Sequence, residues 1–445
     1  MFDRCCFRLG AAFGFCCLLN LSTSMKEKTK VLAGIILWVG VALCFTAAGI
    51  SFLVNGGVES VASAPVATSN IERIAPDSVG LDARLLSYIA DKVEYYIAKG
   101  STEGAVVAVV RDGKLAYIEA FGNRERGGEA MTTDTRFDLA SLTKPVVVST
   151  AIMQLVERGD LRLEERVCNI VPEFVDFVDP KTKEVHYTTI RDLMSHSSGL
   201  RAYVALSRLE EDYPQTEINK SVLLDYIAHS ERLGAPGTVS KYSCLNYILL
   251  GEIIERRTGL PLDVYAEQYI FEPLRMETTC YAPDAEYAML AAPTSPIGAQ
   301  EELCGVVNDP LARVAMGGVS GNAGLFSTAE DLAIYCAMLL NGGEWNGAKI
   351  LSPKAVAKLF EEAECEGSTR AMAWDRLASD FEPFEEGDES AIYVHTGATG
   401  TSIHLDLEHN MAIIILTNRT HVEGAASDIK ELRRGIATIV SYAVK

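Results

Sequence analysis

A serine and a lysine three positions apart, Ser141 and Lys144, are the pair of side chains in this sequence best suited to covalent catalysis. They open a segment with a helical pattern up to about Arg158, where Gly159 is the expected C-terminal cap. Side chains at i and i+3 share one face of a helix, so the amine would lie within reach of the hydroxyl and could activate it. Amides at the helix start would face a developing oxyanion. The spacing therefore predicts acyl transfer through Ser141.

The pair alone is a weak signal, because a serine followed three residues later by a lysine occurs by chance about once in a chain of this length. A second copy, Ser427 and Lys430, lies on a charged amphipathic segment near the C-terminus and is expected to be a solvated helix face. The first copy gains weight only from other segments of the chain.

Two further segments carry side chains that could complete such a site. Tyr242 follows a Pro-Gly turn and begins another helical pattern, for which Ser243 is a suitable N-cap. The second segment follows a predicted strand, and its glycines would let backbone amides approach a substrate closely. It contains the candidate substrate-binding and oxyanion residues His395, Thr396, Gly397 and Ala398.

In this order, the three segments resemble the catalytic motifs of the serine β-lactamase and penicillin-binding-protein family. The likeness is strongest to the class C-like and esterase-like branch of that family. Residues 196–200 and 318–328 look like framework motifs of the same branch, and the resemblance spans about residue 73 to the C-terminus.

The resemblance implies a role for each matching residue. Ser141 would be the acylated nucleophile, Lys144 its activating partner and Tyr242 a proton shuttle to the leaving group. The amides of Ser141 and Ala398 would form the oxyanion hole. A tyrosine acts as a base only if a cation lowers its pKa from about 10, which Lys144 could do. No metal and no cofactor are implied.

Two positions depart from the family pattern. Cys244 stands where the family usually has Asn or Asp, and a thiol is a poor hydrogen-bonding substitute, which weakens the case for β-lactam turnover. His395 stands where many members have Lys. An imidazole with a pKa near 6.5 attracts a carboxylate weakly at neutral pH and more strongly near pH 6. The sequence therefore favours ester hydrolysis.

Several functions remain open at this point. β-Lactamase, D-alanyl-D-alanine carboxypeptidase, D-aminopeptidase and esterase activities share this apparatus. The substrate would be a small molecule or a fragment derived from the cell wall. A competing hypothesis of another class is a non-catalytic cell-surface binding protein that keeps the fold. Cys244 would then be the first sign that the catalytic activity has been lost.

The elements that must position these residues lie at both ends of the chain. Residues 104–110 and 114–120 read as a β-hairpin, strands are expected near 391–394, 401–407 and 411–417, and helices near 82–99 and 425–444. Residues 146–365 are mostly helical pattern and loop. The prediction is an α/β plus α, β-lactamase/transpeptidase-like fold: an antiparallel sheet flanked by helices, with an inserted helical subdomain and the site at their seam. His404 should point outward from its strand.

The N-terminal region predicts a membrane anchor. Residues 31–54 form an uncharged apolar run long enough to cross a hydrocarbon core of roughly 30 Å, and lysines precede it. We expect a cytoplasmic segment at 1–30, a linker at 55–72 and the hydrolase domain at 73–445. Translation starting at Met25 and a cleaved signal are the alternatives. The protein would then be a single-pass cell-membrane protein with its catalytic domain outside the cytoplasm.

Composition narrows the possible partners. The chain has 445 residues, is 48% hydrophobic and carries a net charge of −20, so it repels phosphates and is not expected to bind nucleic acid. Its cysteines after residue 100 are scattered, with no spacing typical of a zinc site, and are read as free thiols or an unassignable disulfide.

Overall fold

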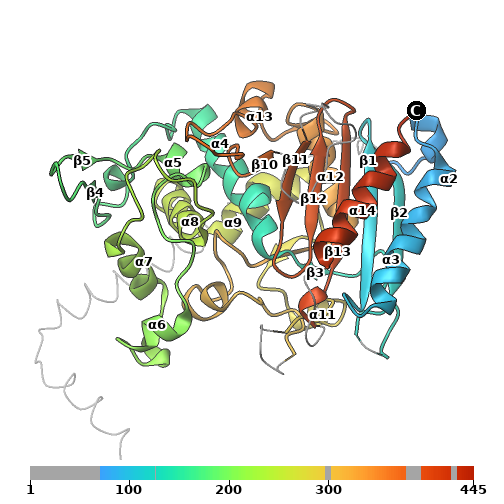
Figure 1. Ribbon diagram of the computed structural model, residues 1–445, viewed down its shortest axis with the longest axis horizontal. Coiled ribbons are helices and arrows are strands. Elements are labelled where there is room, and N and C mark those ends of the chain that lie inside the picture. Colours follow the sequence, from blue (N-terminus) through green and yellow to red (C-terminus); the bar gives the residue numbers. More distant parts are fainter. Residues whose placement is uncertain (1–70, 126, 296–301, 377–391, 422–427) are drawn as a thin grey trace, which may run out of the picture. The chain divides into compact units, whose positions relative to one another are not determined.

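A six-stranded antiparallel sheet brings together strands from distant parts of the chain (Figure 1). The computed structural model describes residues 71–125, 127–295, 302–376, 392–421 and 428–445. The strand order is β10-β11-β12-β13-β1-β2, so Ala105 on β1 pairs with Thr417 on β13. The strands are β1 (Gly104–Arg111), β2 (Lys114–Gly122), β10 (Asp375–Arg376), β11 (Ile392–Thr396), β12 (Ser402–Asp406) and β13 (Met411–Thr417).

The predicted hairpin between β1 and β2 is confirmed. Its turn places Asp112 at φ 51° and Gly113 at φ 70°, the left-handed conformation that a tight two-residue hairpin turn requires. The strands expected near the C-terminus are also present, with ends shifted by a few residues. The predicted fold class, one sheet built from early and late segments, is therefore correct.

Helices cover both faces of this sheet. The strands alternate accordingly: Val107 and Ile415 belong to the core under one face, and Val106 and Ile414 to the core under the other. Figure 1 shows α3 and α14 along one face and α12 behind the sheet. The covering helices are α2 (Ala83–Leu86), α3 (Tyr88–Ala98), α12 (Ala329–Leu340) and α14 (Ile429–Tyr442).

Because both faces are covered, the expectation that His404 points outward is wrong. It lies on the α14 side of β12 and is only 3% exposed, and Arg433 of α14 contributes to lowering its pKa to about 3, after burial itself. Strand alternation assigns a residue to one face of a sheet, but it cannot say whether that face is solvated.

A largely helical part lies between β2 and β10, as predicted for the inserted subdomain (Figure 1). Its helices are α4 (Thr150–Arg158), α5 (Ile190–Met194), α6 (Leu206–Glu210), α7 (Lys220–His229), α8 (Cys244–Thr258), α9 (Leu262–Ala266), α10 (Glu272–Leu274), α11 (Ala285–Ala288) and α13 (Pro353–Leu359). Short 3-10 or π turns are η1 (Pro76–Val79), η2 (Ala140–Leu142), η3 (Lys144–Ser149), η4 (Val167–Asn169), η5 (Gln215–Glu217), η6 (Glu267–Phe271), η7 (Leu311–Ala315) and η8 (Arg419–His421).

Three small sheets complete the described chain. One has the strand order β3-β7-β6, and its strand β3 ends shortly before Ser141 in the chain. The others are two-stranded hairpins, β4 with β5 and β8 with β9. Their bounds are β3 (Phe137–Asp138), β4 (Phe177–Val178), β5 (Val185–His186), β6 (Cys280–Tyr281), β7 (Leu325–Ser327), β8 (Glu344–Trp345) and β9 (Ala348–Lys349).

The predicted membrane segment at 31–54 lies outside the described residues, as do the predicted segment 1–30 and nearly all of the linker. Within the parts of the chain that the structure describes, no helix is both long enough and apolar enough to cross a membrane. The anchor and the domain boundaries therefore stay predictions.

Candidate active site

Ser141 sits on a tight turn between β3 and the helix that follows. Asp138, the last residue of β3, accepts a hydrogen bond from the amide of Ala140 at 2.8 Å. Ala140 has φ 46°, an uncommon conformation for a residue with a side chain, and the Thr143 hydroxyl donates to its carbonyl at 2.7 Å. This strained turn holds Ser141 half-buried at the start of the helix.

The predicted helix after Ser141 is confirmed, although its first part is irregular. It passes through the π turn η3 before α4 begins at Thr150, and it ends at Gly159 with φ 79°. Pro145 lies in this first turn, where its missing N–H is tolerated. The irregular turn keeps Ser141 and Lys144 on one side of the helix.

The Lys144 ammonium is fully buried and has three acceptors, one for each of its protons. Its Nζ donates to Ser141 Oγ at 2.9 Å, to the carbonyl oxygen of Asn322 at 2.8 Å and to Cys244 Sγ at 3.7 Å. Sequence reasoning missed Asn322, which lies in the predicted framework segment 318–328. A buried cation with this set of partners is fixed against the nucleophile.

Tyr242 is held over the same ammonium by a loop. The ring of His196 packs against the Tyr242 ring with centroids 4.6 Å apart and a tilt of 40°, and Lys144 Nζ lies 5.0 Å from the centroid of the Tyr242 ring. The backbone N–H of Ser243 donates to Nδ1 of His196 at 3.1 Å, so this imidazole is neutral with its proton on Nε2. Ser243 also caps α8, as predicted. His196 therefore belongs to the framework of the site.

Burial governs the protonation of the three central groups. Desolvation acts to lower the pKa of Lys144, but the neighbouring Cys244 and Tyr242 raise it above its usual value. Burial raises the pKa of Tyr242, and Lys144 reverses only part of that rise. Burial likewise raises the pKa of Cys244. The expectation that Lys144 would lower the pKa of the phenol below its ordinary value is therefore wrong, and at neutral pH the phenol and the thiol keep their protons.

The ring of His395 is also a neighbour of Tyr242, with ring centroids 6.2 Å apart. It is 3% exposed, and burial first, then the charges of Lys144 and Arg370, hold its pKa well below 6.5. The expectation that His395 gains a proton near pH 6 is therefore wrong. A buried imidazole between two cations stays neutral across the physiological range.

The turn that follows β11 is fastened to the segment before Ser141. Thr399 Oγ1 donates to the carbonyl of Asp138 at 2.7 Å, and Thr401 Oγ1 donates to that of Leu139 at 3.0 Å. A Cβ atom on Gly397 would lie 2.5 Å from the Leu139 carbonyl oxygen, so only glycine fits there. Ala398, at the tip, is exposed.

The structure therefore brings the sequence-predicted site residues together. They are Ser141, Lys144, Tyr242, His395, Thr396, Gly397 and Ala398. The second serine-lysine copy is not comparable, because Ser427 lies outside the described residues and Lys430 is exposed on α14.

Arg370 is the main residue that sequence reasoning missed. Its guanidinium lies 5.2 Å from the centroid of the Tyr242 ring, and its Nη1 pairs with Asp375 at 2.7 Å. Its charge contributes to lowering the pKa of both His395 and His196. No motif surrounds it in the sequence, so only the fold could reveal it. Arg370 gives the site a permanent positive charge that His395 does not provide.

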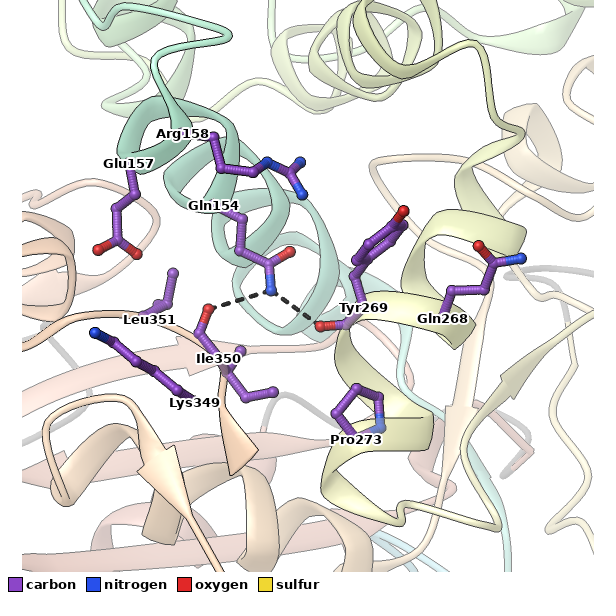
Figure 2. A pocket seen from close by; sticks show the side chains of 9 residues that line it. All are labelled: Gln154, Glu157, Arg158, Gln268, Tyr269, Pro273, Lys349, Ile350 and Leu351. Atoms are coloured by element: carbon purple, nitrogen blue, oxygen red, sulfur yellow. Dashed lines mark hydrogen bonds between the residues drawn. The ribbon is translucent and has the colours of Figure 1, made fainter. Parts of the chain in front are cut away.

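A separate hollow of about 360 Å³ lies at the far end of α4 (Figure 2). Its central side chain, Gln154, donates to the carbonyls of Tyr269 at 2.9 Å and Ile350 at 3.2 Å. The polar group at its centre is thus satisfied within the protein, and none of the predicted site residues lines it. It is not the site of the proposed chemistry.

Cysteines and metal ligands do not alter this assignment. The six cysteines of the described segments are free thiols. Those same segments contain no group of three or more His, Cys, Asp or Glu side chains that could hold a metal ion.

Comparison with known proteins gives one consistent match. The sequence model of the protein family described as Beta-lactamase matches residues 89–437. A curated protein of Bacillus subtilis (strain 168), named N-acetylmuramyl-L-alanine amidase, is 33% identical over 78% of this chain and 84% of its own length.

Two solved structures show the same fold. The first, EstCE1, a hydrolase with promiscuous acyltransferase activity, is 22% identical with a TM-score of 0.64, over 80% of this chain and 99% of its own. The second, a β-lactamase/D-alanine carboxypeptidase from Pseudomonas syringae, is 18% identical with a TM-score of 0.63, over 82% of this chain and all of its own.

Proposed function

Because the chain belongs to the β-lactamase family of serine hydrolases, we propose that it forms an acyl-enzyme at Ser141 and hydrolyses an ester, amide or peptide bond. The observation that carries the proposal is the position of Lys144, whose buried Nζ lies 2.9 Å from Ser141 Oγ. A buried ammonium has no structural need to contact an accessible hydroxyl, whereas it is suited to stabilise the charge that develops when this hydroxyl attacks a carbonyl.

The hydrogen bonds of Lys144 and the raised pKa of Tyr242 support one assignment of the proton transfers. Lys144, with three acceptors around its Nζ, starts as an ammonium, so it stabilises charge and does not accept the serine proton. Tyr242 must first lose its own proton to water, and its phenolate oxygen then takes the proton of Ser141 as Oγ bonds to the substrate carbonyl carbon. Tyr242 passes that proton to the leaving group when the scissile bond breaks. Water then hydrolyses the ester at Ser141 by the same steps in reverse order.

The oxyanion of the tetrahedral intermediate would lie between the backbone N–H groups of Ser141 and Ala398. The hydrogen bonds of Thr399 and Thr401 to Asp138 and Leu139 fix one segment against the other. Because these segments are already joined in the free enzyme, the two donors need little reorganisation as charge develops.

Covalent labelling tests the proposal directly. A fluorophosphonate or fluorescent penicillin should add one adduct to the wild type, located at Ser141 by peptide mass spectrometry. Ser141→Ala should lose both labelling and turnover of p-nitrophenyl esters while its thermal unfolding stays within a few degrees of the wild type. An unlabelled, inactive wild type would favour the non-catalytic binding protein instead. Turnover that survives in the Ser141→Ala variant would place the nucleophile elsewhere.

Uncharged short-chain esters are the favoured substrates. His395 is neutral at all relevant pH values and offers a carboxylate no charge. The thiol of Cys244 is a poor hydrogen-bonding partner for the side-chain amide of a β-lactam or for the amide of a peptide. A panel of p-nitrophenyl esters, nitrocefin and D-amino-acid amides, compared by kcat/KM, tests this order.

A peptide with a free carboxylate is the second candidate, and Arg370 is the observation that supports it. Its guanidinium beside Tyr242 could hold a carboxylate by a charge-assisted hydrogen bond. Under this alternative, Arg370→Gln lowers kcat/KM for a D-alanyl-D-alanine peptide about 10-fold and leaves a neutral ester unaffected. Arg376→Gln is the matched control, because Arg376 is a nearby arginine whose partner is the exposed Glu362.

We also propose that residues 31–54 anchor the protein in the cell membrane, with the hydrolase domain outside the cytoplasm. The uncharged apolar run and the lysines before it support this topology. Alkaline carbonate should fail to release the protein from membranes, and protease added to cells whose outer surface is accessible should degrade the domain. A soluble cytoplasmic pool as the main species would exclude the anchor.

A further inference from the structure

The guanidinium of Arg433, on α14, reaches the turn that follows β11. Its Nη2 donates to the carbonyl oxygen of Gly397 at 3.2 Å and to that of Thr401 at 2.8 Å. Arg433 is 5% exposed, so these bonds form in a largely water-free environment. A hydrogen bond from a charged donor is stronger in such an environment than in water. The buried guanidinium also requires acceptors, and the two carbonyl oxygens provide them.

The Gly397 contact falls on a particular peptide group. The carbonyl of Gly397 and the N–H of Ala398 belong to one planar amide, so a cation bound at the oxygen draws electron density toward it. Hydrogen bonds polarise one another along such a chain, which makes the N–H at the other end a better donor. Arg419 provides a natural contrast, because its Nε donates to Ala398 O at 2.9 Å, which belongs to the next peptide group.

The same peptide group is also held by the turn itself. The N–H of Gly400 donates to the Gly397 carbonyl at 3.1 Å, and the N–H of Gly397, in the preceding peptide group, donates to the Thr401 carbonyl at 2.7 Å. The Gly397 oxygen thus uses both lone pairs, one for the turn and one for Arg433. The orientation of the Ala398 N–H is therefore set before any substrate arrives.

We propose that Arg433 is a positioning residue, which orients the Gly397–Ala398 peptide group and strengthens its N–H as a donor to the oxyanion of the tetrahedral intermediate. This inference rests on the proposed acyl-enzyme function. No proton or covalent bond passes through Arg433. The oxyanion exists only in the transition state and the tetrahedral intermediate. Removing the Arg433 side chain should therefore lower kcat much more than it changes KM.

The test is Arg433→Ala, measured per active site after titration with a fluorophosphonate, so that any unfolded fraction is excluded. We expect kcat for a p-nitrophenyl ester to fall about 10- to 100-fold with KM changed less than about 3-fold. Affinity for a boronic acid, which forms a tetrahedral anion at Ser141, should fall by a similar factor. Guanidinium ion added to the buffer should restore part of kcat. If the alanine variant does not fold, Arg433→Met keeps the packing of the stem and is measured in its place.

Variants at two other arginines distinguish polarisation of the Gly397–Ala398 peptide group from a general loosening of the turn. Arg434→Ala, on the same helix, should keep wild-type kcat. Arg419→Ala should lose less kcat than the Arg433 variant, because it releases the neighbouring peptide group. Wild-type kcat in a folded Arg433 variant overturns the inference, and so do equal losses in both variants without guanidinium rescue. Labelling of Ser141 in the wild type establishes the acyl-enzyme independently of either result.

Discussion

The Lys144 ammonium, which is fully buried, lies 5.0 Å from the centroid of the ring of Tyr242, which is half-buried. Each group favours the charged form of the other: the ammonium favours the phenolate, and a phenolate would favour the ammonium. Desolvation decides the balance, since the pKa of Tyr242 is raised in spite of its neighbour. The protonation state that catalysis needs is thus a minor one at neutral pH.

Activity should therefore increase with pH through the alkaline range. If the Tyr242 phenolate is the base and its pKa lies above 10, log kcat/KM for a neutral ester should rise with a slope near one up to the highest pH at which the protein stays folded. Tyr242→Phe should lower kcat/KM by about 100-fold or more and remove this slope. A profile that is level from neutral pH upward would mean that the phenol is already ionised, contrary to its burial.

His395 should contribute no pH dependence to substrate selection. Because burial holds its pKa well below 6.5, it stays neutral from about pH 5.5 to about pH 8.5. The ratio of kcat/KM for a neutral ester to that for a cephalosporin should therefore be constant over this range, since the dependence on Tyr242 cancels in the ratio. A ratio that narrows on acidification, and no longer does so in His395→Asn, would restore the imidazole as a titrating group.

Replacing Cys244 should shift the substrate preference. Cys244→Asn gives Lys144 a carbonyl acceptor in place of a sulfur at 3.7 Å and adds an amide donor to the site. We expect kcat/KM for nitrocefin to rise about 10-fold relative to a p-nitrophenyl ester. Cys244→Ser, which is small and lacks the amide, should leave the ratio near that of the wild type. Equal changes for both substrates in the Asn variant would show that position 244 acts only through Lys144.

Asp138 should make the fold less stable as pH rises from about 4 to about 6. Burial raises the pKa of this carboxyl to about 6, above its unfolded value of about 3.9, so the folded state binds the proton more tightly. The stability that this proton provides is present below pH 4 and is lost as pH rises through 6. The difference corresponds to about 3 kcal/mol in the free energy of unfolding.

Urea unfolding of the wild type and Asp138→Asn at several pH values checks this. The asparagine cannot titrate, so the wild type should lose stability relative to the variant over that interval and run parallel to it above pH 7. Parallel curves at every pH would show that the carboxyl is ionised throughout, held by the amides of Ala140 and Asn308.

Local patterns explain what the sequence could predict. The β1–β2 hairpin follows from two apolar runs around Asp112 and Gly113, and the contact between Ser141 and Lys144 follows from their spacing on one turn of helix. Both depend only on neighbours in the chain. Order in the sequence was also enough to assemble the remaining motifs through their resemblance to a known family.

Sequence patterns do not predict an environment that distant segments create. Strand alternation points His404 outward because it does not reveal that α14 covers that face. The pKa values of Tyr242 and His395 depend on burial by segments far away in the sequence. No residue near Arg370 in the chain carries a catalytic pattern, and only the fold brings its guanidinium to Tyr242.

The pairing of β1 with β13 has a consequence for the synthesis of this protein on the ribosome. β1 emerges early, with an apolar edge that finds its partner only when nearly all of the chain has been translated. The bond from Thr399 to Asp138 joins positions 261 residues apart, so the turn that carries Ala398 reaches the serine last. During most of its synthesis, a nascent chain therefore has an exposed strand edge and an incomplete active site. Slow folding and a need for chaperone protection during translation follow from this topology.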